Sequence, residues 1–220
     1  MDITGGLSIG RTFLTQLDDL VATNWQYLRC NDIYKLYFEF SNDLKNFRGN
    51  ANGFTGLSEY LIFRFLYHQL GGSFRKESWM TSGVSQFVGK DCRIGQNVPL
   101  YLGDEKRRCV PDIVLYQEDS LIAAIQIKVY LTTGRKEVDK EMETFKELRK
   151  TNPEGFRAML LIYDHSPSDR GLVRQELCRQ KNTNDWFDFL VLRGNDESLA
   201  IKLNTSLQLG RLQPQPPKDI

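Results

Sequence analysis

The spacing of hydrophobic and polar positions predicts helices over the first third of the chain. Residues 11–48 carry apolar side chains at helical spacing among charged ones, which predicts one or two helices. A loop rich in Gly and Asn follows at 48–53, and another helix is expected from there to about Leu70. Gly71 and Gly72 end that helix, because two consecutive glycines strongly disfavour its continuation.

Strand signals dominate the middle of the chain. Periodicity is weak from 73 to 104, where Gln86–Val88 and Val98–Leu102 are the candidate strands. Val110–Tyr116 then predicts a clear strand, and a short polar turn leads into the long apolar stretch Leu121–Leu131. These two strands predict a β-hairpin.

Helices and strands alternate in the remaining part. The predicted elements are a charged amphipathic helix, a buried strand, a second helix and a final strand, at Gly134–Lys150, Phe156–Tyr163, Ser166–Gln180 and Phe187–Leu192. The order of elements predicts an α/β fold, with helices flanking a mixed central sheet of about five strands. We expect an N-terminal helical region over 1–50, a core over 51–205 and a disordered tail over 206–220.

Composition limits the classes of protein to consider. The chain has 220 residues, 40% of them hydrophobic, which is enough for one sizeable core. Its net charge of +1 indicates no general polyanion-binding surface, so a nucleic-acid site must come from local placement of charge. The four cysteines lack zinc-ligand spacing, and no signal peptide or membrane span is evident. We therefore expect a cytoplasmic protein without a membrane partner.

Lys128 is an unusual residue for its position. It lies in the predicted strand Leu121–Leu131, in which both faces are mostly apolar. Burying an ammonium group without compensation is costly, so Lys128 needs an anionic partner or a catalytic role. The alternative is that Lys128 begins the exposed end of the strand and extends its amine into water.

The turn of the hairpin decides whether Asp112 meets Lys128. A three-residue turn over 118–120 sets Asp112 directly opposite Gln126, with Lys128 on the diagonal at roughly 7 Å. A two-residue turn places Asp112 on the opposite face unless a β-bulge intervenes. We expect the three-residue turn.

Glu59 supplies a second acid, on the helix that precedes Gly71. Helical spacing places it among Ile62 and Leu66 on the apolar face, whereas Arg64 and His68 fall on the side expected to be exposed. A lone carboxylate on an apolar face must be paired, bound to metal or protonated. A salt bridge to a core cation is the alternative to a functional role.

Together these residues resemble the PD-(D/E)XK signature of restriction endonucleases and related nucleases. The resemblance rests on a proline and an acid, a hairpin, and a Gln-x-Lys pattern, at Pro111, Asp112, Gln126, Ile127 and Lys128, with Glu59 upstream. It covers about Phe54 to Tyr163 and implies a restriction-endonuclease-like core. Gln126 stands where an acid is usual, as in the similar Mrr-type enzymes. Its amide oxygen can ligate a hard cation but adds no negative charge.

The resemblance implies a metal-dependent endonuclease that hydrolyses DNA. Mg²⁺, or Mn²⁺ in its place, would be held by Asp112, the Gln126 amide, the Ile127 carbonyl and Glu59 through water. Lys128 would orient or help deprotonate the attacking water. Cutting both strands of a duplex would imply a homodimer, with the N-terminal helices as interface.

Basic and aromatic residues near the motif extend this hypothesis. Arg135, Lys136 and Lys140 lie just beyond the site and are candidates for phosphate contacts, although the charged helix that carries them is typical of a solvated face. Lys106, Arg107 and Arg108 are comparable candidates, and Tyr130 and Trp79 are candidates for base stacking.

Other interpretations remain open from the sequence. The chain is alternatively a catalytically decayed nuclease-fold module that binds nucleic acid or a protein partner. A third alternative is an unrelated α/β domain in which Asp112 and Lys128 merely pair in the core. Residues 5–12 have P-loop spacing, but Arg11 replaces the lysine and too few residues precede them for a strand. His68 and His165 have no evident catalytic partners.

Overall fold

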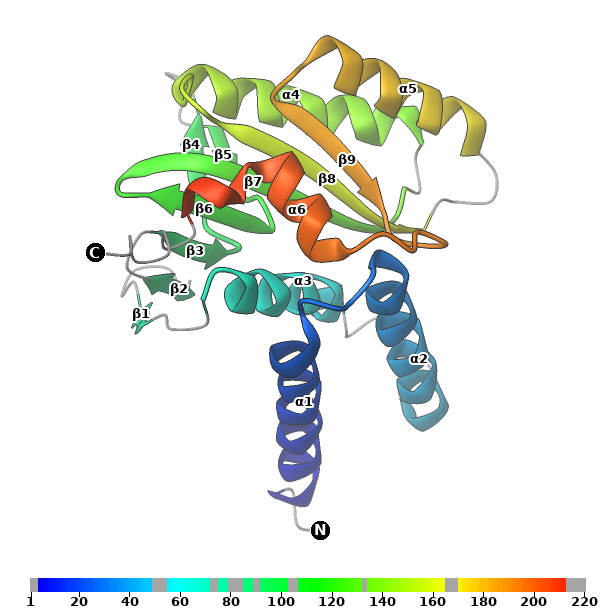
Figure 1. Ribbon diagram of the computed structural model, residues 1–220. Coiled ribbons are helices and arrows are strands. Elements are labelled where there is room, and N and C mark those ends of the chain that lie inside the picture. Colours follow the sequence, from blue (N-terminus) through cyan, green and yellow to red (C-terminus); the bar gives the residue numbers. More distant parts are fainter. Residues whose placement is uncertain are drawn as a thin grey trace, which may run out of the picture.

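In the computed structural model, one mixed β-sheet lies between two layers of helices (Figure 1). The structure describes residues 4–48, 55–71, 75–78, 85–88, 92–102, 107–131, 134–164 and 170–212. The sheet has seven strands in the order β1-β2-β3-β6-β7-β8-β9. Their bounds are Arg75–Ser78, Ser85–Val88, Arg93–Gln96, Ile113–Gln117, Ser120–Tyr130, Arg157–Asp164 and Phe187–Val191.

The sheet changes direction at its longest strand, β7. Strands β1, β2, β3, β6 and β7 pair antiparallel, whereas β7, β8 and β9 pair parallel. The predicted α/β class with a mixed central sheet and flanking helices is confirmed, and the sheet has seven strands, with β1 and β9 at its edges. A separate two-stranded ribbon consists of β4, Leu100–Leu102, and β5, Arg107–Cys109.

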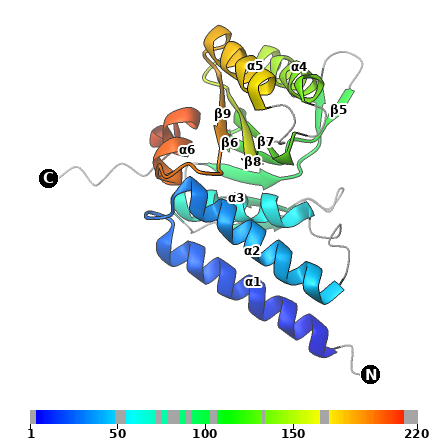
Figure 2. The same ribbon diagram turned by 90° about the vertical axis from the view of Figure 1, so that its right-hand side faces the viewer.

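Helices cover both faces of the sheet (Figures 1 and 2). Helices α4 and α5 lie on one face, and α3 and α6 lie on the other. Helix α1 packs beyond α3, whereas α2 also contacts the sheet, since its Tyr37 ring lies 4.8 Å from that of Tyr163 on β8. The bounds of α1 to α6 are Thr4–Asn24, Cys30–Arg48, Thr55–Gln69, Arg135–Thr151, Arg170–Thr183 and Leu199–Leu207, followed by a short 3-10 helix at Leu209–Leu212. Among the described residues, no helix is both long and apolar enough to cross a membrane.

Each face of the sheet has its own apolar core. On β7, Ile125 and Ile127 pack toward α3 and α6, whereas Leu121 and Ala124 pack toward α4 and α5. Burial of each isoleucine or leucine among them contributes about 2 kcal/mol. A strand buried on both sides explains the near-continuous apolar sequence of β7 and leaves any polar residue on it in need of a partner.

Helix α1 covers a side of α3 that we expected to be exposed. Arg64 on α3 donates to both carboxylate oxygens of Asp18 on α1, at 2.5 and 2.7 Å, and His68 lies 3.2 Å from the same group. Burial acts to raise the pKa of Asp18, but the bonds from Arg64 and His68 outweigh it and lower that pKa. The prediction of an exposed face was therefore wrong, because α1 supplies Asp18 as the partner of Arg64 and His68.

The predicted start of a disordered tail at residue 206 needs correction. Helix α6 continues to Leu207, and Leu207 and Leu209 are fully buried in the α3 side of the core. The Ser198 hydroxyl caps the start of this helix by accepting a bond from the Ile201 amide at 3.4 Å. The expected tail from 213 onward lies outside the described residues. Residues 5–12 belong to α1, which excludes a P-loop there.

Candidate active site

The β6–β7 hairpin has a two-residue turn, so the predicted three-residue turn was wrong. Gln117 pairs with Ser120, and Glu118 takes up a left-handed backbone conformation with φ of 53°. By strand alternation alone, this turn would send Asp112 to the face opposite Gln126.

A β-bulge restores the predicted facing of Asp112. Leu115 pairs with Ala123 but Tyr116 pairs with Leu121, which leaves Ile122 as the extra residue of β7. One additional residue reverses the alternation, so the last pair of the ladder is Ile113 with Ile125. Asp112, which immediately precedes β6, is consequently aligned with Gln126. The turn and the bulge have cancelling effects on which face Asp112 occupies.

The Asp112 carboxylate sits where the hairpin strands separate. Its Oδ2 accepts one bond from Gln126 Nε2 at 2.8 Å and another from the Ile127 amide at 2.5 Å. The Asn97 amide donates to the Asp112 carbonyl at 3.0 Å, which anchors the backbone to the end of β3. Asp112 is only 7% exposed, so these bonds fix a nearly buried acid in one orientation.

The backbone carbonyl of Ile127 is also available at this position. The Ile127 N–H points toward Asp112, beyond the last β6–β7 pair. In an antiparallel ladder the N–H and C=O of one residue point to the same side of the strand. The Ile127 carbonyl is therefore directed to the side that β6 has left, as the predicted ligand role requires.

Electrostatics at Asp112 favour an added positive charge. Burial raises the pKa of Asp112 to about 7; the Ile127 amide opposes this rise, and the negative charge of Glu59 adds to it. Lys128 lowers the pKa, but by a smaller effect than either burial or Glu59. A divalent cation bound between the two acids would remove the repulsion between them.

Glu59 lies at the same corner of the sheet, held by two amide side chains. Its Oε2 accepts from Asn97 Nδ2 at 3.0 Å and from Gln96 Nε2 at 3.5 Å. Within the described part of the chain, no lysine or arginine forms a salt bridge with Glu59, so the alternative of a core ion pair gains no support. Asn97 contacts both acids, because its backbone bonds to Asp112 and its side chain to Glu59.

Lys128 is paired with α4 rather than with Asp112. Its Nζ lies 2.9 Å from Glu141 Oε1 and 3.6 Å from Glu137 Oε1. Burial acts to lower the pKa of Lys128, but the bond from Glu141 and the charges around it raise that pKa, so the amine stays protonated. The described ion pairs include none between Asp112 and Lys128, which removes the main premise of a simple core pair.

Sequence reasoning missed Glu141 and Asn97. Glu141 was assigned to a solvated charged face, but it is 9% exposed and shares the buried side of α4 with Val138, Met142 and Phe145. The helical-spacing argument applied to Glu59 identifies Glu141 as well, because it also lies in an apolar stripe. Asn97 has φ of 54°, and a left-handed residue between two strands leaves only a weak signal in one sequence.

A pocket of about 440 Å³ opens on the α4 side of the sheet, beside Gln126 and Lys128; Asp112 and Glu59 are not among the residues that line it. Gln126 and Lys128 from β7 line it, together with Arg107 and Arg108 from β5 and Lys140 from α4. Three of the predicted phosphate-binding residues are therefore brought to the site. Arg135 instead pairs with Asp139 at 3.9 Å and Glu176 at 3.7 Å, and neither it nor Lys136 lines the pocket.

The remaining candidates lie away from the site or outside the described residues. His68 contacts Asp18 on the far side of α3, as a structural residue would. Tyr130, at the end of β7, is 40% exposed. His165, Trp79 and Lys106 lie outside the described part of the chain.

The oxygen atoms of the site suit a hard cation, but the side-chain amide of Gln126 is turned the wrong way to bind one. These atoms belong to Asp112, Glu59, Gln126 and Ile127, and oxygen is the ligand Mg²⁺ prefers. Gln126 turns its amide nitrogen to Asp112, so joint coordination requires its terminal amide to rotate and present Oε1. Among the described residues, no three His, Cys, Asp or Glu side chains form a metal-binding group.

Comparisons with known proteins do not assign this chain to a family. The chain matches no protein-family model, no curated protein and no solved structure. The functional argument therefore rests on the geometry of the site.

Proposed function

We propose that this chain is a Mg²⁺-dependent endonuclease of the PD-(D/E)XK type, which hydrolyses phosphodiester bonds of DNA in the cytoplasm. One observation carries the proposal. Asp112 and Gln126 are hydrogen-bonded where the β6–β7 hairpin opens, and Gln126 and Lys128 line a pocket whose other charged residues are three cations and two acids. A buried acid, a paired lysine and a basic approach are the groups that hydrolysis of a phosphodiester requires.

Each residue has a distinct role in this mechanism. Asp112, Gln126 Oε1 after rotation of its amide, the Ile127 carbonyl and Glu59 through water would hold the cation, and Mn²⁺ could take the place of Mg²⁺. The bound cation supplies Lewis acidity to the scissile phosphate. Lys128 orients the attacking water and balances charge on the phosphate.

Glu141 supports Lys128 and supplements Gln126. It holds Lys128 Nζ at 2.9 Å, which fixes the position of the amine. It also adds to the local negative charge, since it raises the pKa of Asp112 together with Glu59. The site therefore has a third acid nearby, although Gln126 itself is neutral.

A second candidate function is a catalytically decayed module that binds nucleic acid. Two contacts favour it: Gln126 presents its amide nitrogen to Asp112, and Lys128 is neutralised by Glu137 and Glu141. Such a module would keep the basic pocket and bind DNA without a cation. Cleavage and binding assays separate the two functions.

The deciding experiment is cleavage of supercoiled DNA with Mg²⁺, Mn²⁺ or EDTA. We expect cleavage with either cation and none in EDTA, and a loss of about a thousandfold or more in Asp112→Ala and Lys128→Ala. Asp119→Ala and Lys150→Ala are matched controls, because both side chains are exposed and distant from the pocket lining. Linear product without a nicked intermediate would indicate paired sites and the predicted homodimer.

Folding must be checked for each variant, since Lys128 is partly buried. Circular dichroism and thermal unfolding serve this purpose. Metal-independent binding without cleavage by the folded wild type would support the decayed module and contradict the nuclease.

A further inference from the structure

Two pockets in the described part of the chain have similar volumes but differ in how their charged residues are paired. The pocket beside Gln126 and Lys128 has a volume of about 440 Å³, and another, of about 450 Å³, lies along the edge strand β9 between α5 and α6. Each is lined by four Lys or Arg residues and two acids. The pairing of these charges therefore decides which pocket can attract an anion.

The cations of the β9 pocket are mostly neutralised. Three of the four each lie 2.7 Å from a carboxylate oxygen: Lys181, Arg193 and Lys202, with Asp188, Asp164 and Glu197 as their partners. The fourth, Arg174 on α5, is exposed and forms no ion pair within the described part of the chain. This pocket consequently has little charge available for a ligand.

The pocket beside Lys128 has three unpaired cations. Lys128 itself is held by Glu141 of the lining at 2.9 Å, and by Glu137 beyond it at 3.6 Å. The other three cations are exposed and form no ion pair among the described residues: Arg107, Arg108 and Lys140. Against these three stands one further acid of the lining, Glu143, which is also exposed. The lining therefore has a surplus of two positive charges.

This pocket adjoins the proposed cation site without being part of it. Gln126 lines the pocket and donates to Asp112, whereas neither Asp112 nor Glu59 lines it. The unpaired cations come instead from β5 and from α4. The pocket is thus an anion-binding neighbour of the acidic corner, with Gln126 between the two.

A phosphate at the end of a DNA strand has the charge that this surplus matches. A phosphodiester inside a strand carries one negative charge, whereas a phosphate monoester carries about 1.5 to 2 at pH 7 and offers three strong acceptor oxygens. Arginine binds such oxygens through two parallel N–H bonds. The volume of about 440 Å³ also lies in the range of pockets that enclose one small ligand.

We propose that this pocket binds the terminal phosphate of a DNA strand, with Arg108 and Lys140 contacting its oxygens. The inference rests on the proposed nuclease function for naming DNA, and it adds the part of the substrate that is held beside the cation site. A free phosphate ion shares this chemistry, so the experiment has to separate the two ligands. Circular DNA has no terminal phosphate, so its cleavage does not depend on this pocket.

Binding of DNA ends in EDTA tests the inference without requiring catalysis. Fluorescence anisotropy would compare one internally labelled duplex in three forms: with 5′-phosphates, with 3′-phosphates, and with hydroxyl groups at every end. We expect one phosphorylated form to bind about tenfold more tightly than the hydroxyl form. Arg108→Gln and Lys140→Gln should each reduce its affinity to that of the hydroxyl form. Both side chains are exposed, so both variants should fold, which circular dichroism checks.

Arg174→Gln and Lys146→Gln are the matched controls. Arg174 lines the β9 pocket, and Lys146 is an exposed residue of α4 that lines neither pocket. Both variants should keep the tenfold difference. Equal affinity of the wild type for all three forms, or a difference that survives both Arg108→Gln and Lys140→Gln, would overturn the inference.

Further outcomes separate this inference from its rivals. If inorganic phosphate raised the Tm of the wild type but not of Arg108→Gln, without any preference among DNA ends, the pocket would be a site for free phosphate and the inference would fail. Cleavage of supercoiled DNA with Mg²⁺ but without end preference would leave the nuclease proposal standing and overturn this one. End preference that depends on Arg108 and Lys140, without cleavage of any substrate, would support the pocket and contradict the nuclease.

Discussion

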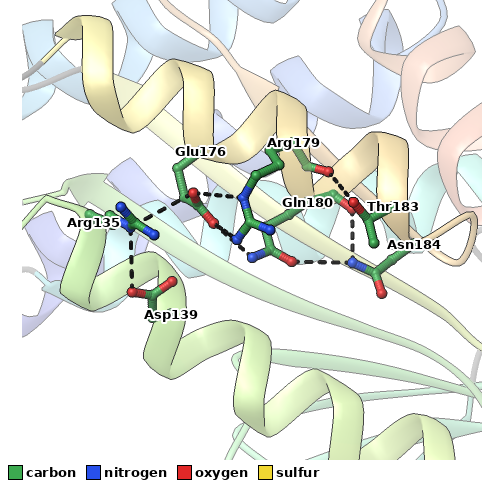
Figure 3. A network of polar contacts seen from close by, with 7 residues as sticks. All are labelled: Arg135, Asp139, Glu176, Arg179, Gln180, Thr183 and Asn184. Carbon is green, nitrogen blue, oxygen red and sulfur yellow. Dashed lines mark hydrogen bonds and ion pairs between the residues drawn. The ribbon is translucent and has the colours of Figure 1, made fainter.

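Glu176 is an ionised side chain held almost out of water between α4 and α5 (Figure 3). It accepts bonds from Arg179 and from Gln180 Nε2, the latter at 2.7 Å, and Arg135 approaches from α4 at 3.7 Å. The Arg179 bond is the main cause that lowers the pKa of Glu176 from 4.5 to about 2, against the effect of burial. The network therefore connects the two helices above the sheet through one carboxylate.

We predict that Glu176→Gln makes the free energy of unfolding less dependent on pH in the acidic range. A lowered pKa contributes stability that is present above pH 4.5, the ordinary value, and is lost as pH falls toward about 2. The variant should have a lower free energy of unfolding than the wild type near neutral pH, and the difference should shrink at about pH 3. Urea unfolding at the two pH values measures it.

Glu147→Gln is the control for this residue. Glu147 also pairs with a cation, Lys150 at 2.6 Å, but that pair lies largely in solvent on α4. Exposed pairs contribute little to stability, so this substitution should have a small effect at both pH values. If the free energy of unfolding differed between the wild type and Glu176→Gln by the same amount at both pH values, the lowered pKa of Glu176 would be contradicted.

At the scale of elements, the β6–β7 hairpin shows what the sequence could and could not predict. The two strands and the alignment of Asp112 with Gln126 were predicted, but from a wrong turn. Leu121, Ile122 and Ala123 are all apolar because both faces of β7 are buried, so hydrophobic alternation carries no signal for the bulge.

The same limit applies to the partners of the site. Lys128 was predicted to need an anionic partner or a catalytic role, and its partner Glu141 lies in a helix that is separate in sequence. Helical spacing alone places Glu141 in an apolar stripe, but its contact with Lys128 depends on how α4 crosses β7. Asp112, Gln126 and Glu59 were predicted from local patterns, whereas Asn97 emerges only from the three-dimensional arrangement.

The left-handed backbone conformation of Glu118 is expected to lower the free energy of unfolding, and this effect can be measured. A side chain in the left-handed region is strained, and Glu118 has φ of 53° in the two-residue turn. Glu118→Gly should therefore raise the free energy of unfolding by about 1 kcal/mol, measured by urea unfolding. Glu118→Ala keeps the strain and should bring no gain. Equal stability of the two variants would contradict a strained turn.

At the scale of the whole molecule, the site is a junction of several elements. The corner combines α3, the end of β3, the opening of the β6–β7 hairpin and the inner side of α4. Packing of the sheet against both helical layers brings Asp112 and Glu59 together there. The free energy of this packing offsets the repulsion between the two acids. The folded chain is consequently expected to bind a divalent cation, whereas the unfolded chain has no such site.

This difference predicts that Mg²⁺ stabilises the protein through Asp112. A ligand at about a hundred times its dissociation constant adds about 2.7 kcal/mol, which for a chain of this size corresponds to a rise in Tm of about 5 to 10 °C. Asp112→Asn should abolish the rise and, in EDTA, should unfold at a higher Tm than the wild type, because it removes a buried charge beside Glu59. Asp119→Asn, at an exposed position of the same hairpin, should keep the full response to Mg²⁺. An equal rise in all three proteins would place the cation elsewhere and remove the main support for a metal-dependent reaction at this corner.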